Sequence, residues 1–298
     1  MITISHLSKS FNKFKAVSDL NLEIKNGEIM GFAGLNGAGK STTIRAMAGI
    51  IFPTSGTVSI DNNDIVREKV KASKHLGWVP ELPNFEVNAK PIPLLKYYGG
   101  FYEYGAGELD KKIKELMEEF GIYNYRNRKL KYYSQGMKKR FSLIAAMIGD
   151  PDNYLFDETL NGLDPQGVKE VRDIIINLKK DGKSVFLSSH ILSELQNVAD
   201  KIAIIKNGQL IKILTREELV NLGSSGIKIH ITNPDKGVID ILSSFGETSL
   251  TGDYYFIKKG GNQDPAGINK ELVMKNYMVD YIGRENETLE EYFLEMVK

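Results

Sequence analysis

The chain of 298 residues has no cysteine and a single tryptophan, and its positive and negative charges nearly cancel. The absence of cysteine excludes disulfides, thiolate metal sites and cysteine nucleophiles, and it fits a reducing compartment. A formal net charge of +1 gives no electrostatic basis for binding nucleic acid, so we expect no nucleic-acid partner. No apolar run approaches the roughly 18 residues that span a bilayer, and the N-terminal residues lack the regions of a signal peptide. We therefore expect that any work at a membrane depends on another chain for the membrane spans.

The strongest local feature is the run from Gly34 to Thr42, which fits the phosphate-binding pattern G-x-x-x-x-G-K-[ST]. Residues 28–33 before it read as a buried strand, and the residues after it begin a helix. In this setting backbone N–H groups and the positive end of the helix form an anion cradle. A glycine-rich turn that only joins a strand to a helix is the alternative, and the flanking pattern favours nucleotide binding. The expected nucleotide ligands are Gly34, Asn36, Gly37, Ala38, Gly39, Lys40, Ser41 and Thr42, with Lys40 on the β- and γ-phosphates and Ser41 on Mg²⁺.

The hydrophobic patterns divide the chain into an α/β part and a smaller C-terminal part. Strand patterns extend to about residue 84, helical patterns follow between about 85 and 150, and short apolar strands return between 153 and 208. Helical stretches separate these later strands, which predicts a mostly parallel sheet interrupted by a helical insertion. We place a domain boundary at 221/222, near a turn at 223–226. Beyond it, alternating strands, helical stripes and a capping box of Thr288 with Glu291 predict a small α+β module at 222–298.

A second apolar strand, residues 153–156, ends in Asp157 and Glu158. The first carboxylate can lie near the water shell of a cation, and the second can orient or deprotonate an attacking water. Two acidic residues at a strand end are common, so the pair alone is a weak signal. The order of the surrounding motifs makes it strong: Tyr133 to Arg140 precede this strand, Asn161 to Pro165 follow it, and Leu187 to His190 come later.

In this order and spacing, residues 1 to about 215 resemble the ATP-binding cassette family, the nucleotide-binding subunits of ABC transporters. The resemblance implies an α/β fold: a P-loop NTPase core with a mostly parallel sheet, an antiparallel β subdomain and a helical insertion. It also implies ATP as substrate, Mg²⁺ as cofactor, and a head-to-tail dimer with two ATP molecules between one subunit's phosphate loop and the other's signature segment. The partner in this dimer is the same chain or a different cassette.

The resemblance further implies roles for single residues. Ser134, Gln135 and Gly136 of the signature segment contact the partner's nucleotide, although a glycine turn before a basic helix would look the same. Asp164 bridges the two subunits. The remaining catalytic and metal-binding residues implied by the family are Glu158 as base, His190 at the γ-phosphate and the water, and Ser41, Asp157 and Glu81 at Mg²⁺.

Some positions leave alternatives open or depart from the family. Phe11 corresponds best to the aromatic residue that stacks on adenine, with Phe14 as a nearby competitor, and either could belong to the core. Glu81 stands where glutamine is usual; it keeps an oxygen ligand and adds a charge beside ATP, with effects on metal affinity or hydrolysis. The signature segment also differs from its commonest form. Thr159 replaces the usual proline, a change that nothing in the sequence explains.

These expectations combine into an ATP-hydrolysing subunit on the inner, cytoplasmic face of a cell membrane, driving transport through a separate membrane-spanning permease subunit. The helical insertion should form a groove for a short helix of that partner. A lone cassette with this C-terminal extension looks like the drug- and antibiotic-export branch of the family. A soluble cassette ATPase working in translation, repair or iron–sulfur assembly is the rival, and the C-terminal module could also regulate the ATPase. The sequence does not indicate the transported substrate.

Overall fold

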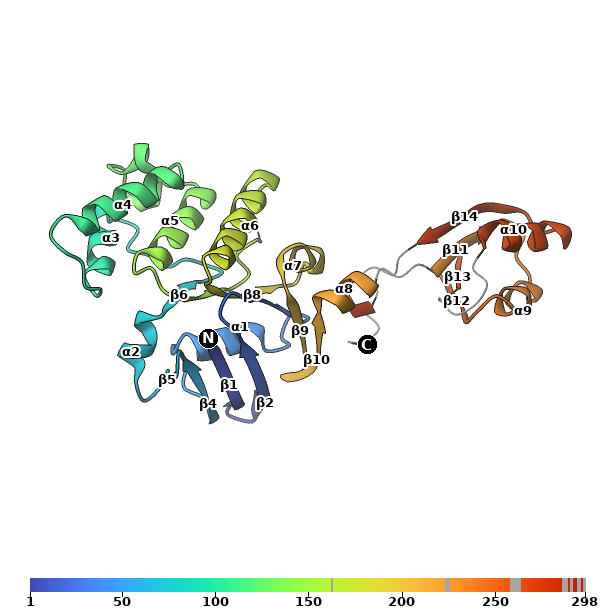
Figure 1. The fold of residues 1–298 in the computed structure, drawn as a ribbon, viewed down its shortest axis with the longest axis horizontal. Coiled ribbons are helices and arrows are strands. Elements are labelled where there is room, and N and C mark those ends of the chain that lie inside the picture. The colour runs from blue at the N-terminus through green and yellow to red at the C-terminus, as the bar shows by residue number, and fades with distance from the viewer. Residues whose placement is uncertain are drawn as a thin grey trace. The chain divides into compact units, whose positions relative to one another are not determined.

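The structure is a computed structural model that describes residues 1–161, 163–222, 226–257, 264–285, 289, 292, 293 and 296. Its chain divides into two compact units, Met1–Thr215 and Arg216–Lys298, each described here by itself (Figure 1). The sequence placed this boundary six residues later, at the end of helix α8 (Arg216–Leu222). In the described part of the chain, no helix combines the length and the apolar character needed to cross a membrane.

The first unit is built on a six-stranded sheet in the order β10-β9-β3-β8-β7-β6. Its pairs are parallel except for β10, which runs antiparallel to β9. Every residue of β3, β7 and β8 is buried, as expected for parallel strands covered on both faces. The predicted parallel sheet is therefore confirmed. Its strands are β3 (Ile29–Ala33), β6 (Leu76–Val79), β7 (Asn153–Phe156), β8 (Ser184–Ser189), β9 (Lys201–Lys206) and β10 (Gln209–Thr215).

A second, antiparallel sheet in the order β2-β1-β4-β5 forms the predicted β subdomain. Helix α1 (Lys40–Met47) packs between the two sheets, because its Ile44 and Met47 share one buried cluster with Ile4 of β1 and Phe32 of β3 (Figure 1). This packing fixes the start of α1 at the edge of the parallel sheet. The strands are β1 (Ile2–Phe11), β2 (Phe14–Ile24), β4 (Ser55–Ile60) and β5 (Asn63–Asp64).

The predicted helical insertion gathers α3 (Pro91–Gly99), α4 (Glu108–Glu119) and α5 (Gln135–Met147) into one cluster (Figure 1). The helical spacing of apolar residues predicted which face of α4 is buried. Its residues Ile113, Leu116 and Met117 are at most 3% exposed. Short 3₁₀ turns lie at Tyr123–Tyr125 and Leu130–Tyr132. The other helices of this unit are α2 (Lys69–Lys74), α6 (Pro165–Lys180) and α7 (Leu192–Val198).

The second unit has its own hydrophobic core under a four-stranded antiparallel sheet in the order β12-β13-β11-β14. After α8, the element order is β-α-β-β-α-β, the split βαβ arrangement. Ile227, Ile229 and Ile231 alternate inward from β11, as predicted, while the short strand β12 was not expected from the sequence. Its elements are β11 (Gly226–Ile231), α9 (Gly237–Ser243), β12 (Thr248–Thr251), β13 (Tyr254–Ile257), α10 (Pro265–Met274) and β14 (Val279–Glu285). The turn at 223–225, the strand end at 258–259 and the capping box of Thr288 with Glu291 lie outside the described residues.

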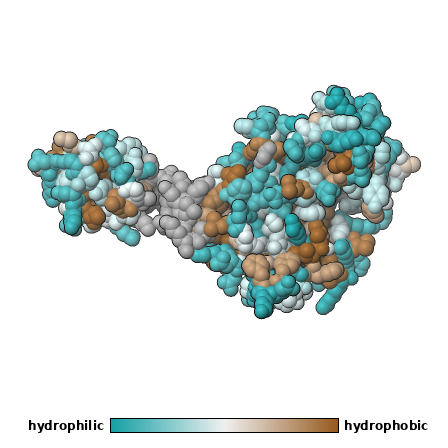
Figure 2. Space-filling view, turned by 180° about the vertical axis from the view of Figure 1, so that it is seen from behind, coloured by the Kyte–Doolittle hydropathy of each residue, from teal (hydrophilic) through white to brown (hydrophobic). Residues whose placement is uncertain are grey.

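Hydrophilic residues cover much of the surface, and hydrophobic residues gather in separate patches on the larger part (Figure 2). Among the described apolar side chains, Leu82, Val70 and Met274 are the most exposed, with exposed fractions of 75–81%. Leu82 and Val70 line the same cavity of the first unit, so their exposure belongs to one surface feature.

A buried amide ties the parallel sheet to the β subdomain. Asn153 is fully buried at the start of β7. Its Nδ2 donates to the carboxylate of Asp61 at 2.8 Å and to the carbonyl oxygen of His75 at 3.1 Å. Because buried polar groups that lose their partners are costly, this amide should contribute strongly to stability.

We expect Asn153→Ala to lower the free energy of unfolding of the first unit by roughly 2–4 kcal/mol, since two partly buried acceptors lose the buried amide that donates to them. Urea unfolding followed by the fluorescence of Trp78, the only tryptophan, measures the change. The exposed Asn88→Ala serves as the control and should shift stability by less than about 0.5 kcal/mol. An equally small effect of Asn153→Ala would contradict the proposed contribution of this amide.

Candidate nucleotide-binding site

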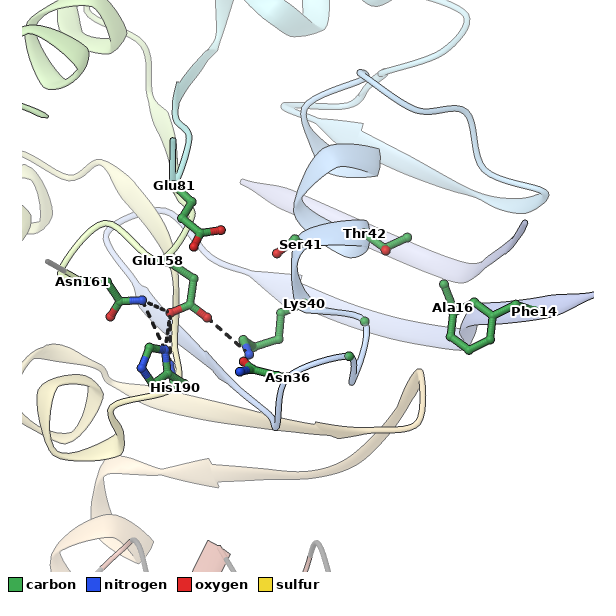
Figure 3. A pocket seen from close by; sticks show the side chains of 12 residues that line it. Phe14, Ala16, Asn36, Lys40, Ser41, Thr42, Glu81, Glu158, Asn161 and His190 are labelled. Atoms are coloured by element: carbon green, nitrogen blue, oxygen red, sulfur yellow. Dashed lines mark hydrogen bonds and ion pairs between the residues drawn. The ribbon is translucent and has the colours of Figure 1, made fainter. Parts of the chain in front are cut away.

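A pocket of about 340 Å³ lies where the parallel strands β3, β6, β7 and β8 end (Figure 3). The carboxyl ends of parallel strands meet at one edge of a sheet, which is where open α/β folds bind ligands. The chain segments that leave these strands carry the phosphate loop, Glu81, the acidic pair and His190. The pocket is lined by Phe14, Ala16, Asn36, Gly37, Gly39, Lys40, Ser41, Thr42, Glu81, Glu158, Asn161 and His190.

The phosphate loop follows β3 and leads directly into α1. Gly37 and Gly39 have φ angles of +81° and +109°, in the region that favours glycine. A Cβ on Gly39 would lie 2.5 Å from the carbonyl oxygen of Ala16, whereas a Cβ on Gly37 would meet nothing within 4 Å. No side chain caps the N-terminus of α1 and its first turn has no acidic residue. Its first N–H groups therefore suit an anion.

Glu158 stands at the centre of the polar contacts in the pocket (Figure 3). Its Oε1 lies 3.3 Å from Nζ of Lys40, which also donates to the carbonyl oxygen of Gly34 at 2.8 Å. Its Oε2 accepts from Nδ2 of Asn161 at 2.6 Å and lies 2.9 Å from Nδ1 of His190. The side chains of Lys40 and Glu158 are 5% and 7% exposed, while that of His190 is 51% exposed. The ion pair is thus buried and the histidine covers it on the solvent side.

A serine from β8 binds the backbone of Glu158 and the carboxylate of Asp157. The Glu158 N–H donates to Oγ of Ser188 at 2.9 Å, and the Ser188 hydroxyl donates to Oδ1 of Asp157 at 3.0 Å. Glu158 has a φ of +47°, a strained conformation for a non-glycine residue that persists where surrounding contacts impose it. The sequence motif contained Ser188 and Asn161 but gave neither a role, because their contacts depend on the order of the strands.

Burial and hydrogen bonding shift the pKa values of Glu158 and Asp157 in opposite directions. Burial is the largest influence on Glu158 and by itself raises its pKa, but the His190 hydrogen bond and the Lys40 charge together bring that pKa below its ordinary value. Burial raises the pKa of Asp157, and the hydrogen bond from Ser188 only partly offsets this effect. Glu158 is therefore ionised near neutral pH, as a proton acceptor must be.

The oxygen donors of the pocket fit a hard divalent cation. The hydroxyl of Ser41 and the carboxylate of Glu81 line the pocket, and hydroxyl and carboxylate oxygens are the ligands that Mg²⁺ prefers. Asp157, the third expected ligand, does not line the pocket and is only 2% exposed beneath it. Its position permits contact through a water more readily than directly.

Lys139 of α5 is a buried cation that the sequence did not single out. It is 7% exposed, and its Nζ lies 3.4 Å from the carbonyl oxygen of Glu81. Burial lowers its pKa to about 8, against the opposing charges of Asp157, Glu81 and Glu158. Two of these carboxylates, Glu81 and Glu158, line the nucleotide pocket, so Lys139 belongs to its electrostatic surroundings.

The expected signature residues lie apart from this pocket. Ser134 caps α5 by accepting from the N–H of Met137 at 3.2 Å, and Asp164 caps α6 by accepting from the N–H of Gly167 at 2.9 Å. Ser134, Gly136 and Asp164 line a second pocket of about 210 Å³, and Gln135 is not among its lining residues. Gly162 of the adjoining motif is outside the described residues.

The structure brings Phe14, rather than Phe11, to the nucleotide pocket. The two residues pair across the β1–β2 hairpin, but only Phe14 lines the pocket, at the side opposite Glu158 (Figure 3). The ring of Phe11 instead lies 4.9 Å from Nζ of Lys9. Sequence position could not separate them, because the hairpin register decides which ring faces the pocket.

Comparisons with known proteins agree with this geometry. The family model described as ABC transporter matches residues 17–161. The uncharacterized ABC transporter ATP-binding protein YhcH of Bacillus subtilis is 33% identical, over 99% of this chain and 95% of its own length. The bacitracin transport ATP-binding protein BcrA of Bacillus licheniformis is 30% identical, over 100% and 97%. The cassette MJ0796, solved as a dimer bound to ADP and Pi, has a TM-score of 0.67 at 22% identity, over 72% of this chain and 99% of that chain, a likeness of fold.

We expect Gly39→Ala to weaken ATP binding at least about tenfold, because the added methyl group forces the phosphate loop away from Ala16. Gly37→Ala is the matched control, since it adds the same group at a positive φ with open space around it, and its effect should be several-fold smaller. Equilibrium binding of a fluorescent ATP analogue measures both affinities. Equal losses in the two variants would show that backbone strain, and not the contact with Ala16, dominates.

Proposed function

The chain belongs to the ATP-binding proteins of ABC transporters, and from this membership we propose how its site hydrolyses ATP and serves transport. The observation that carries the proposal is the buried Glu158 carboxylate, held between Lys40 on one oxygen and His190 with Asn161 on the other. A fixed, ionised carboxylate beside a phosphate cradle is the arrangement that water attack on a γ-phosphate requires.

Glu158 is the general base in this proposal. The phosphate oxygens of ATP compete with its carboxylate for the ammonium of Lys40, which lies 3.3 Å from Oε1. Once Lys40 binds phosphate, Oε1 can accept a proton from the attacking water. His190 contacts Glu158 through Nδ1, which leaves Nε2 for a γ-phosphate oxygen. Asn161 keeps the carboxylate oriented throughout.

The remaining residues of the pocket bind and orient the nucleotide. The N–H groups of the phosphate loop and of the first turn of α1 hold the phosphates, and Phe14 stacks on adenine at the other side of the pocket. Ser41, Glu81 and Asp157 would hold Mg²⁺, which neutralises the charge that develops on the phosphates.

A head-to-tail dimer would complete each site. Ser134, Gln135 and Gly136 lie at the exposed start of α5, where the hydroxyl, the backbone N–H groups and the helix dipole can meet a γ-phosphate. They do not line this chain's own nucleotide pocket, so we assign them to the partner's ATP. Asp164 lies beside them and would bridge the subunits. The partner is a second copy or a different cassette.

A groove of about 680 Å³ is proposed as the docking site of a membrane-spanning permease subunit. Residues of α2, β6, α3 and α5 line it. Leu82, Val70 and Phe101 leave 63–81% of their surface exposed there, which suits an apolar helix face. Docking in this groove would place the cassette on the cytoplasmic face of the membrane.

The relative BcrA is named for bacitracin transport, and it aligns with this chain from end to end. We therefore favour export of a drug or peptide antibiotic over a soluble role in translation, repair or iron–sulfur assembly. The alignment includes the second unit, and we propose that residues 222–298 within it act as an accessory, regulatory module.

We expect Glu158→Gln to lower ATP hydrolysis at least about 100-fold and to yield a dimer that depends on Mg-ATP, because the bound nucleotide is no longer consumed. Steady-state hydrolysis and light scattering with and without Mg-ATP measure the two effects. The exposed Glu118→Gln on α4 should match the unmodified protein in both assays. Wild-type hydrolysis by Glu158→Gln would contradict the base assignment, whereas ATP binding without dimers would contradict pairing of identical chains.

We expect Phe101→Asp to weaken binding to membranes that contain the permease subunit roughly 30-fold, since a buried aromatic anchor typically contributes about 2 kcal/mol. Cosedimentation of the purified cassette with stripped membranes of the source cell measures this, together with ATPase activity in solution, which should not change. Phe52→Asp is the control, because Phe52 is similarly exposed, at 61% against 63%, and lies outside the groove. Equal binding by both variants would contradict docking at this groove.

A further inference from the structure

Lys139 has no role in the proposed hydrolysis, and yet it is buried beside the residues that perform it. Its side chain comes from the second turn of α5, and its ammonium lies 3.4 Å from the main-chain oxygen of Glu81. Removing an ammonium group from water is unfavourable unless nearby negative charge compensates for it. An arrangement that does not favour folding is expected mainly at functional sites.

Lys139 lies near several negatively charged side chains around the pocket. Glu81 and Glu158 both act on Asp157 and raise its pKa, and all three carboxylates act on Lys139. Glu158 is paired with Lys40 at 3.3 Å. Within the described residues, no ammonium or guanidinium lies within 4 Å of the other two carboxylates. At longer range, the charge of Arg45 acts on Asp157, and the charge of Lys139 interacts with all three carboxylates.

Of the three carboxylates, that of Glu81 is the most exposed and can most easily turn away from the other two. It follows β6 in a segment without regular structure, and it is exposed at the rim of the pocket, where its side chain points toward Ser41 (Figure 3). Repulsion from Asp157 and Glu158 favours turning this side chain outward, where water solvates the charge. A positive charge buried behind the same segment opposes that turn.

We infer that Lys139 is a positioning residue. Its buried positive charge offsets the negative charges of Glu81 and Asp157 and so keeps the Glu81 carboxylate inside the nucleotide pocket. This inference rests on the proposed function for its effect on hydrolysis, but the electrostatic coupling itself does not. Because α5 begins at Ser134, the same lysine links the helix assigned to the partner's ATP with a residue at this chain's own nucleotide.

A double-mutant cycle of Lys139→Met and Glu81→Gln tests the inference. Lys139→Met should lower kcat about tenfold while Glu81 is present, because the repelled carboxylate leaves the pocket. In the Glu81→Gln background the same change should lower kcat less than about threefold, because a neutral amide is not repelled. The concentration of Mg²⁺ that gives half-maximal activity should rise in Lys139→Met and return toward the wild-type value in the double variant.

A second readout needs neither nucleotide nor metal. Thermal unfolding of the four nucleotide-free proteins, followed by Trp78 fluorescence, measures the same coupling in the fold. The change in melting temperature caused by Lys139→Met should be roughly 2–4 °C more favourable in the Glu81→Gln background than in the wild type. In that background the substitution removes no attraction between the ammonium and the Glu81 carboxylate.

Lys183→Met is the matched control, since Lys183 is another largely buried lysine, paired with Asp152 at the opposite end of β8. Its effects on melting temperature should be equal in both Glu81 backgrounds. Equal effects of Lys139→Met in both backgrounds, on kcat and on melting temperature, would overturn the inference and leave only the contact with the Glu81 carbonyl. Undiminished hydrolysis by Glu158→Gln would instead overturn the proposed function while the melting-temperature coupling persists.

Discussion

The buried ion pair of Lys40 with Glu158 is the interaction on which the site depends. It joins the loop after β3 to the end of β7, two segments brought together because both strands border β8 in the parallel sheet. With side chains only 5% and 7% exposed, the pair lies where charges attract more strongly than in water. Phosphate oxygens that displace Glu158 from Lys40 therefore act on the proposed base directly, which connects nucleotide binding to the chemistry.

Much of the fold and most of the residues that line the nucleotide pocket could be predicted, because they rest on local spacing. The strand–loop–helix around Lys40, the apolar strand that ends at Asp157 and the alternation of Ile227, Ile229 and Ile231 each appear within ten residues of sequence. Strand ends in a parallel sheet then bring Lys40, Glu81, Glu158 and His190 to one edge, so their meeting in a single pocket follows from the fold class.

The residues that the sequence did not reveal act through tertiary contacts. Ser188 binds Glu158 and Asp157 only because β8 lies beside β7, and Asn161 reaches Glu158 through the turn that follows. Phe14 faces the pocket because of a hairpin register, and the spacing of Lys139 on α5 resembles that of any amphipathic helix. In each case the residue type is ordinary and the position in the fold gives it a role.

The site concentrates several arrangements that do not favour folding: a left-handed backbone at Glu158, a carboxyl group of raised pKa at Asp157 and a buried ammonium at Lys139. The surrounding cluster of fully buried apolar residues, which includes Phe32 and Phe186, supplies the stability that tolerates them. Of these three arrangements, the Asp157 carboxyl group is the one that Mg²⁺ would stabilise in the proposed site. In the proposed function, a bound Mg²⁺ would therefore offset part of the cost of burying this carboxyl group.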